Sequence, residues 1–358
     1  MSSVLAGLGC VPHGSRVGKG GDRTGEIRQG DGGDRESAWQ QRYGMIVQYA
    51  ETFKLAQLTD VHLGPLPPFH PRHWNVKRAL GFINFHRKRF AFNDPTLVNQ
   101  LVADVAQQSV DHVAVTGDLT NIGMPPEFIQ SHAWLQTVGD PSAVTVIPGN
   151  HDVYTRLWQD PGIERWRPYM AGRGEHDAVP GLVAPLDSGF PFVRTFGRFA
   201  LIALNSAVYM PPAIPAGRVG DEQTARFVEM SRHLHAAGYV RIVLIHHPPL
   251  LAHGTTRCLR DASSFEKALV AAGAELVLHG HNHRDMISWR DTATGPLPIV
   301  GAAAAGEGSY NIYQVRRAPD GMCRIDVSIR RAERAGEPVV EVAQMVLDPV
   351  SDRREQVL

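Results

Sequence analysis

The sequence predicts an α/β fold with an added antiparallel part (α+β), on three observations. From residue 53 onward, short apolar runs alternate with segments whose apolar residues recur at helical spacing. That order builds a largely parallel sheet covered by helices. The last third of the chain instead carries strand candidates in succession, which favours antiparallel pairing. The chain has 358 residues, 43% of them hydrophobic and 20% charged, so it is long enough to bury a sizeable core.

Each expected element has its own local signal. Leu97, Leu101 and Val105 recur at helical intervals after Asp94, a residue type that caps helices. Two prolines at 125–126 are typical of a helix start, and β-branched and apolar residues dominate the short strand-like runs. The expected strands are 53–60, 112–118, 143–150, 198–206, 240–247, 274–283, 298–302, 310–315 and 323–331, and the expected helices are 95–108, 125–138, 221–236 and 262–272.

The chain is expected to form one folded domain, residues 51–345, between two tails. Residues 11–44 are rich in Gly, Arg, Asp and Ser, and such a segment cannot bury enough surface to offset its ordering entropy. We therefore predict a disordered N-terminal tail at 1–50 and a C-terminal tail at 346–358. Met45 is an alternative first residue.

Composition excludes several classes of protein. Thirty-six basic residues balance thirty-six acidic ones, so no overall charge recruits nucleic acid or membrane. Three widely spaced cysteines form no disulfide framework and suit a reducing cytoplasm. No stretch approaches the roughly 20 apolar residues of a membrane-spanning helix. The expected location is the cytoplasm, with peripheral contact to the inner membrane as the alternative.

Polar side chains follow five of the expected strands directly. Because the carboxyl ends of parallel strands meet at one edge of a sheet, where α/β sheets bind ligands, we expect them to form one site. Each cluster alone would also suit a turn or a helix cap, but all five fall on the same edge. They are Asp60 and His62; Asp118; Asn150, His151 and Asp152; His246 and His247; and His281 and His283.

The donor types in these clusters predict a metal centre. If the chain stays extended past 274–278, His281 and His283 point to the same side, which suits a metal. Carboxylates, a carboxamide and imidazoles without thiolate fit Mn, Fe, Zn or Co ions. The donors outnumber the needs of one tetrahedral ion, which indicates two. Such a pair, about 3.5–4 Å apart, shares a carboxylate and holds a bridging hydroxide that attacks phosphorus in line.

The ordered set of motifs resembles the calcineurin-like metallophosphoesterase superfamily. The resemblance spans about residues 53–315 and implies a two-sheet β-sandwich flanked by helices, with hydrolysis of phosphoric esters as the activity. The motifs are Asp60-Val-His62, Gly117-Asp118, Gly149-Asn150-His151-Asp152, His246 and Gly280-His281-Asn282-His283.

The resemblance also implies a role for each residue. His151 is the expected catalytic acid, and Asp152 is expected to orient it. His247 is the alternative to His246 as a ligand, Asn205-Ser206 is expected to be structural, and His279 is expected to lie beneath the site. The implied ligands are Asp60, His62, Asp118 and His283 for one metal, and Asp118, Asn150, His246 and His281 for the other.

The motifs define the chemistry and leave the substrate open. The HHPP stretch and the single-domain size resemble the bacterial cyclic-nucleotide phosphodiesterase branch, which favours cyclic nucleotides or other small phosphodiesters. One alternative is a UDP-diacylglucosamine-type pyrophosphatase acting on an amphiphile. Another class, a non-catalytic metal-stabilised scaffold, is disfavoured because it would not require His151 and Asp152.

An insertion at 71–94 carries six Lys and Arg residues with no acid before Asp94, interspersed with Trp74 and several phenylalanines. A basic, aromatic segment could hold an anionic amphiphile or rest on an anionic membrane surface. Stacking aromatics and cations would also serve single-stranded nucleic acid, a partner that the balanced charge disfavours. The alternative interpretation is that the aromatic rings pack into the core while the cations face water.

Overall fold

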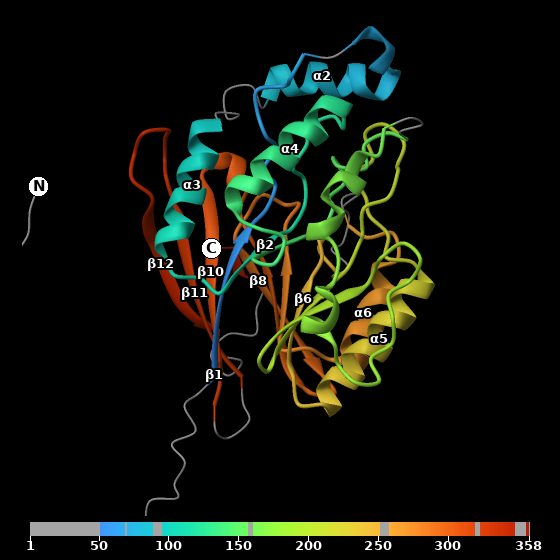
Figure 1. The fold of residues 1–358 in the computed structure, drawn as a ribbon, viewed down its shortest axis with the longest axis vertical. Helices are drawn as coiled ribbons and strands as arrows, with labels where there is room; N and C mark the ends of the chain where they lie inside the picture. Colours follow the sequence, from blue (N-terminus) through green and yellow to red (C-terminus); the bar gives the residue numbers. More distant parts are fainter. Residues whose placement is uncertain are drawn as a thin grey trace, which may run out of the picture. The chain divides into compact units, whose positions relative to one another are not determined.

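The computed structural model describes most of the chain from Glu51 onward, and the expected N-terminal tail lies outside this part. Two sheets face each other, with helices along their outer sides (Figure 1). This arrangement confirms the two-sheet α/β fold expected from the sequence. The described residues are 51–68, 70–88, 95–156, 160–250, 258–318, 323–347 and 356–357.

The first sheet has six strands in the order β12-β11-β10-β1-β2-β3. Three of them are parallel, and the other three pair antiparallel along one side, as the succession of strand candidates predicts. The parallel strands are β1 (Glu51–Leu58), β2 (His112–Val115) and β3 (Val144–Val146), and the antiparallel ones are β10 (Ser309–Arg317), β11 (Cys323–Arg331) and β12 (Val340–Leu347).

The second sheet has seven strands in the order β13-β8-β9-β7-β6-β5-β4. Its centre is parallel and its two sides are antiparallel. The strands are β4 (Phe192–Phe196), β5 (Phe199–Ala203), β6 (Val240–Leu244), β7 (Leu276–His279), β8 (Met286–Thr292), β9 (Gly295–Gly301) and β13 (Gln356–Val357).

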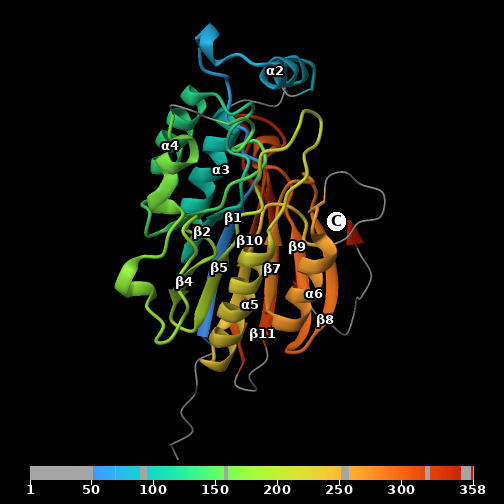
Figure 2. The same cartoon turned by 90° about the vertical axis from the view of Figure 1, so that its right-hand side faces the viewer.

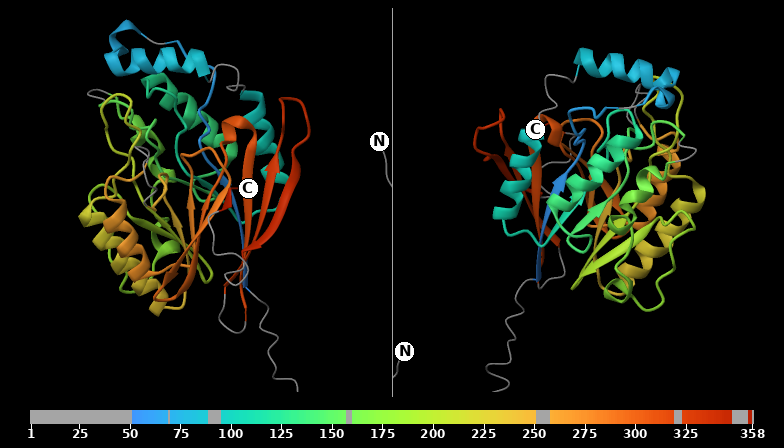
Figure 3. Two further views of the ribbon diagram at one scale, coloured as in Figure 1. Left: turned by 180° about the vertical axis from the view of Figure 1, so that it is seen from behind. Right: turned by 45° about the horizontal axis from the view of Figure 1, so that its top comes forward.

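Helices cover the outer faces of both sheets. Helices α5 and α6 lie side by side on the second sheet, whereas α3 and α4 lie along the first (Figure 2). A further helix, α2, lies across the end of the domain above α4 (Figure 3). The bounds are α2 (Val76–Lys88), α3 (Pro95–Gln107), α4 (Pro125–Val138), α5 (Asp221–Ala236) and α6 (Ala262–Ala272), with short 3-10 helices η1 (Pro71–His73), η2 (Gly162–Tyr169), η3 (Gly174–Asp177) and η4 (Ala305–Glu307).

The apolar runs of the second sheet are continuous because both of its faces are buried. Leu201 and Leu244 belong to the core between the sheets. Their neighbours Ile202 and Val243 pack with α5 and α6 on the other face. Most positions of β5 and β6 are therefore apolar, and the exception, Arg241 of β6, is buried in an ion pair with Glu275.

Several boundaries differ from the expectation. Helix α2 was not expected, and β9 begins before Pro296 and Pro298, in a part that pairs with β8 alone because β7 joins β9 only from Ile299. The expected tail at 346–358 contains the end of β12 and the short strand β13. Asp94, Arg89, Phe90 and Phe92, and the side chains of Arg87 and Lys88, lie outside the described residues. Among the described residues, no helix combines the length and apolar character needed to cross a bilayer.

Candidate metal centre

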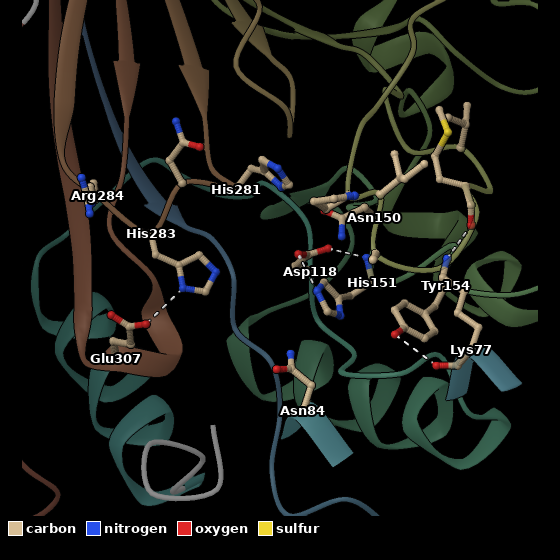
Figure 4. Close-up of a pocket in the computed structure, with 16 residues that line it drawn as sticks. Lys77, Asn84, Asp118, Asn150, His151, Tyr154, His281, His283, Arg284 and Glu307 are labelled. Carbon is tan, nitrogen blue, oxygen red and sulfur yellow. Dashed lines mark hydrogen bonds and ion pairs between the residues drawn. The ribbon is translucent and has the colours of Figure 1, made fainter. Parts of the chain in front are cut away.

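The polar residues that follow β1, β2, β3, β6 and β7 come together at one edge of the two sheets. In the close-up, Asp118 lies between His283 on one side and His151 on the other (Figure 4). The site opens into a cavity of about 570 Å³. All seven residues proposed as ligands from the sequence belong to this cluster, so the strand-end argument brings the correct segments together. They are Asp60, His62, Asp118, Asn150, His246, His281 and His283.

Carboxylate and imidazole atoms at this edge form overlapping groups. In each group the candidate ligand atoms lie within 4.8 Å of one another. One group combines Asp60 with His62 and His283, and another joins Asp60 to Asp118 and His246. Because the groups share members, the cluster is large enough for two neighbouring ions.

Asp118 lies in the middle of the part of the cluster that contains Asn150, His246 and His281, called here the second half. Its Oδ2 lies 3.5 Å from His246 Nε2 and 3.8 Å from His62 Nε2. His246 Nε2 is also 3.3 Å from Asn150 Oδ1. The other ring nitrogen of His246, Nδ1, donates to the carbonyl of Thr116 at 2.7 Å. That bond fixes the tautomer and leaves Nε2 facing Asp118 and Asn150, as ligand histidines require.

The first half of the cluster, which contains Asp60, His62 and His283, is held in a similar way. Asp60 Oδ1 lies 3.3 Å from His283 Nε2. His62 Nδ1 donates to the carbonyl of Thr120 at 3.0 Å, and His283 Nδ1 lies 3.1 Å from Glu307 Oε1. Sequence reasoning missed Glu307, which comes from η4 and has no motif of its own. In both His62 and His283, the group that contacts Nδ1 leaves Nε2 facing the carboxylates.

The backbone at these positions is left-handed, not extended. Asp60, His62 and Asp118 have φ of 50°, 44° and 56°, and His281 and His283 have φ of 72° and 54°. The expectation that His281 and His283 share a side because the chain stays extended is therefore wrong. They face one site because tight turns redirect them, and five strained residues in one cluster are typical of a functional site.

Two motif glycines make room for the carboxylates. A Cβ on Gly149 would lie 2.2 Å from Asp118 Oδ1, and one on Gly280 would lie 2.6 Å from Asp60 Oδ2. Such separations are far below van der Waals contact, so an alanine at either position would displace a carboxylate. This is the physical reason why glycine precedes Asn150 and His281 in this sequence.

His151 is held by a carbonyl group, not by Asp152. Its Nδ1 donates to the carbonyl of Asn121 at 2.5 Å, and its ring stacks on Tyr154 with centroids 5.5 Å apart. Its Nε2 lies 4.0 Å from Asp118 Oδ2. The ring therefore presents Nε2 to the cluster.

Asp152 organises the loops around the site. Its Oδ2 accepts N–H groups from Asp118 at 2.8 Å and from Gly149 at 2.9 Å, and its Oδ1 accepts the N–H of Thr120 at 2.9 Å. The expected orienting role of Asp152 toward His151 is thus corrected: Asn121 orients the ring, while Asp152 ties the backbones of the second and third motifs together.

Burial and neighbouring charges determine which side chains of the cluster carry a proton. Burial opposes ionisation of Asp118, but the neighbouring His246 and His151 hold its pKa well below the ordinary value. Burial opposes protonation of His246, yet Asp118 raises its pKa to about 9. Burial lowers the pKa of His281 to about 3, so this imidazole is neutral, the form that binds metal.

The donor set fits divalent cations. His281 Nε2 is buried and has no hydrogen-bond partner within the described part of the chain. A buried polar atom without a partner is costly, which a bound cation would relieve. Oxygen and nitrogen donors without thiolate suit hard to borderline ions such as Mn²⁺, Fe²⁺ or Zn²⁺.

The neighbouring histidines are fixed by other groups. His247 belongs to a group with His246 and His281; its Nδ1 hydrogen-bonds Ser206 Oγ at 2.8 Å, and its Nε2 is buried without a hydrogen-bond partner in the described part of the chain. His246 is the one whose ring reaches Asp118 and Asn150, which favours it over His247 as the ligand. His279 is buried, and its carbonyl accepts from Gln57 Nε2 at 3.0 Å.

The cavity has a polar side and an apolar wall. Lys77 and Asn84 of α2 line it together with Tyr154 and Arg284. Sequence reasoning did not place Tyr154 or Arg284 there, because neither belongs to a motif. The apolar wall consists of Val208, Met210, Ala213, Ile214 and Pro215.

Known proteins share the sequence pattern and the fold. Residues 53–285 match the family described as calcineurin-like phosphoesterase. A probable cyclic nucleotide phosphodiesterase of Synechococcus sp. is 26% identical over 250 residues, covering 68% of this chain and 79% of that protein. The structure resembles a dimetal phosphatase from Danio rerio with a TM-score of 0.51 and 14% identity, over 81% of this chain and 99% of that one. At this identity the likeness concerns the fold alone.

Proposed function

The chain belongs to the calcineurin-like phosphoesterase family, and from that premise we propose that it hydrolyses cyclic nucleotides or other small phosphodiesters. It is a metallophosphoesterase, a hydrolase acting on phosphoric esters. The observation that carries the proposal is Asp118, which lies within reach of both halves of the donor cluster at the base of a cavity of about 570 Å³. A cavity of this size suits a nucleotide-sized ligand.

We propose two sets of metal ligands, which the family resemblance implies and these contacts support. When bound, two divalent ions would supply an activated water and offset charge on the phosphoryl oxygens. The chain's own contribution is to bury most of the side chains that would bind the ions. The carbonyls of Thr116 and Thr120 also keep the rings of His246 and His62 in one tautomer. The proposed sets are Asp60, His62, Asp118 and His283 for one ion, and Asp118, Asn150, His246 and His281 for the other.

His151 is the proposed acid that protonates the departing oxygen. Its Nδ1–H is engaged by the Asn121 carbonyl, so Nε2 is the atom that exchanges a proton with the substrate. Asp118, 4.0 Å from that atom, would stabilise the imidazolium. General acids positioned in this way contribute about 10²–10⁴-fold to rates.

Turnover of bis(p-nitrophenyl) phosphate with added Mn²⁺, Fe²⁺ or Zn²⁺ tests the proposal, followed by cyclic AMP and cyclic GMP. We expect metal-dependent hydrolysis of the diester and of at least one cyclic nucleotide. Inactivity with every ion, in protein shown to bind metal, would favour a non-catalytic metal-stabilised scaffold.

A UDP-diacylglucosamine-type pyrophosphatase is the second candidate, and one observation favours it. Lys77 and Asn84 of helix α2 line the cavity, and Leu80 and Ile83 on the adjacent face of the helix are about half exposed. An amphiphile could contact both. Hydrolysis of a nucleotide-diphosphate lipid faster than any soluble diester would select this candidate.

Lys77 is expected to bind the anionic substrate. Its Nζ donates to the Met210 carbonyl at 2.8 Å and lies 4.3 Å from the centre of the Tyr154 ring. Lys77→Met should raise KM about tenfold or more with a smaller change in kcat, because a hydrogen bond to a charged group contributes about 1.5–3 kcal/mol. Steady-state kinetics measure this, with Lys267→Met, an exposed lysine of α6, as the matched control.

The pH dependence provides a second readout of the same residue. Burial lowers the pKa of Lys77 to about 8, so the ammonium is present below pH 8 and is lost as the pH rises through that value. The KM difference between wild type and Lys77→Met should therefore shrink above pH 8. A difference that stays constant from pH 7 to 9 would contradict the charge-based role.

A further inference from the structure

Helix α2 carries a cavity-lining face and, next to it, an exposed aliphatic face. Lys77, Gly81 and Asn84 lie on the face toward the cavity. Val76, Leu80 and Ile83 recur at the same helical spacing on another face and are 75%, 52% and 49% exposed. The side of α2 that packs on the domain carries Arg78, Gly81 and Phe85, whereas the aliphatic residues face outward.

The orientation of α2 is fixed by specific contacts with the domain. Arg78 donates to the carbonyl of Gly123 at 2.5 Å, and the hydroxyl of Tyr154 donates to the carbonyl of Lys77 at 3.4 Å. A Cβ on Gly81 would lie 2.5 Å from that hydroxyl, so the helix packs there as closely as glycine allows. Phe85 is buried at the same interface. These contacts keep the aliphatic face pointing away from the body of the domain.

The outward face, together with the preceding Trp74, forms what we call the α2 stripe: Trp74, Val76, Leu80 and Ile83. Trp74 is 39% exposed. Exposed apolar side chains that lie next to one another often mark an interaction surface. The stripe therefore needs an occupant that offers an apolar environment.

The charge around the stripe indicates which occupant. No acidic residue occurs from Gly64 to Asn93, whereas Lys77 and Arg78 are turned inward and add no charge to the stripe. Arg72, beside Trp74, is exposed. Basic residues next to an apolar helical face are typical of helices that rest on anionic bilayers, with tryptophan at the headgroup level.

Other occupants fit less well. A second copy of the chain packed about a two-fold axis would bring the same basic segment against itself, so like charges would face each other. Single-stranded nucleic acid is bound by aromatic rings that stack on bases, whereas Val76, Leu80 and Ile83 are aliphatic.

We infer that the α2 stripe docks this protein on an anionic lipid surface. Because the adjacent face of α2, with Lys77 and Asn84, lines the cavity, docking holds the cavity close to the headgroups. The inference depends on the fold and composition of α2 and not on the proposed substrate.

Co-sedimentation with vesicles tests the inference. The full chain is mixed with vesicles of phosphatidylcholine alone or with phosphatidylglycerol added, at low and high salt. We expect binding to the anionic vesicles that weakens with salt. Val76→Asp should reduce that binding about tenfold or more. It removes the apolar contact of one valine and adds a negative charge that the anionic lipids repel.

Val342→Asp on β12 is the matched control, because Val342 is also a largely exposed valine, at 49%. It should bind vesicles as the wild type does. Leu80→Asp is the second test variant. Equal binding by Val76→Asp and wild type, or an equal loss in Val342→Asp, would overturn the inference.

Two further outcomes also decide against it. Absence of vesicle binding by a wild type that hydrolyses the soluble diester would reject the lipid surface and leave the proposed function intact. A change in sedimenting mass in Val76→Asp without any change in vesicle binding would assign the stripe to a second copy of the chain.

Discussion

Asp118→Asn is expected to lose both divalent ions and to slow diester hydrolysis by about 10⁴-fold or more, since the ions supply several kcal/mol of transition-state stabilisation. Asp118 is the carboxylate nearest to both halves of the cluster, 3.8 Å from His62 and 3.5 Å from His246. Removing its charge also removes the group that raises the pKa of His246 to about 9. Metal content by mass spectrometry and turnover with added Mn²⁺ are the two measurements.

The asparagine variant separates the loss of charge from a loss of structure. The N–H of His151 donates to Asp118 Oδ1 at 2.7 Å, and the amide oxygen of asparagine can accept the same bond. We therefore expect a folded protein with a circular dichroism spectrum like that of the wild type. Asp187→Ala, at an exposed carboxylate, should keep both ions. An Asp118→Asn protein that retains two ions per chain and near wild-type turnover would refute the bridging role.

The sequence could predict which segments meet in the site because strand ends are local features. Short apolar runs end at Leu58, Val115 and Val146, and a polar cluster follows each within a few residues. Parallel pairing of these strands then brings the clusters to one edge without any knowledge of side-chain positions. Residue type and topology alone were sufficient for this part of the site.

The internal geometry of the site could not be predicted in the same way. His281 and His283 share the site through left-handed turns, φ 72° and 54°, which close contacts with distant residues select. A Cβ on Gly280 would collide with Thr59 Oγ1, a residue more than two hundred positions earlier in the chain. No local pattern reports such a contact.

Helix α2 illustrates the same limit for the insertion. Its sequence showed basic and aromatic residues, and the two interpretations differed in which of them face water. The structure divides them differently: Lys77 and Arg78 are turned inward, Phe85 is buried, and the aliphatic residues face outward. Tertiary contacts with Tyr154 and Gly123 determine this orientation, so amphipathic spacing alone would have assigned the faces the wrong way round.

One loop joins α2 to the proposed acid. Glu127, buried at the start of α4, accepts the N–H groups of Asn121 at 2.6 Å and Met124 at 2.8 Å. The same loop offers the Gly123 carbonyl to Arg78 and the Asn121 carbonyl to His151. The position of the His151 ring therefore depends on backbone groups that α2 also contacts, which connects the insertion to the chemistry of the site.

His151→Ala is expected to keep both ions while kcat falls about 10²–10⁴-fold, the usual contribution of a general acid. The proposed ligand sets do not include His151, and its ring is held by Asn121 and Tyr154. The loss should be larger for a cyclic nucleotide than for a p-nitrophenyl diester, because a sugar alkoxide needs a proton to leave and p-nitrophenolate needs it much less. Metal analysis and kcat on both substrates measure these effects.

The metal content of this variant separates two roles that the geometry allows. His62, Asp118 and His151 also form a group whose candidate ligand atoms lie within 4.8 Å of one another, so His151 could instead bind an ion. Loss of an ion in His151→Ala, with an equal fall in rate on both substrates, would identify it as a ligand. His176→Ala, at an exposed histidine remote from the motifs, should change neither quantity. Full metal content with a leaving-group-dependent fall in kcat would assign the proton transfer to His151, because a proton donor assists a poor leaving group more than a good one and the retained ions exclude a lost metal as the cause.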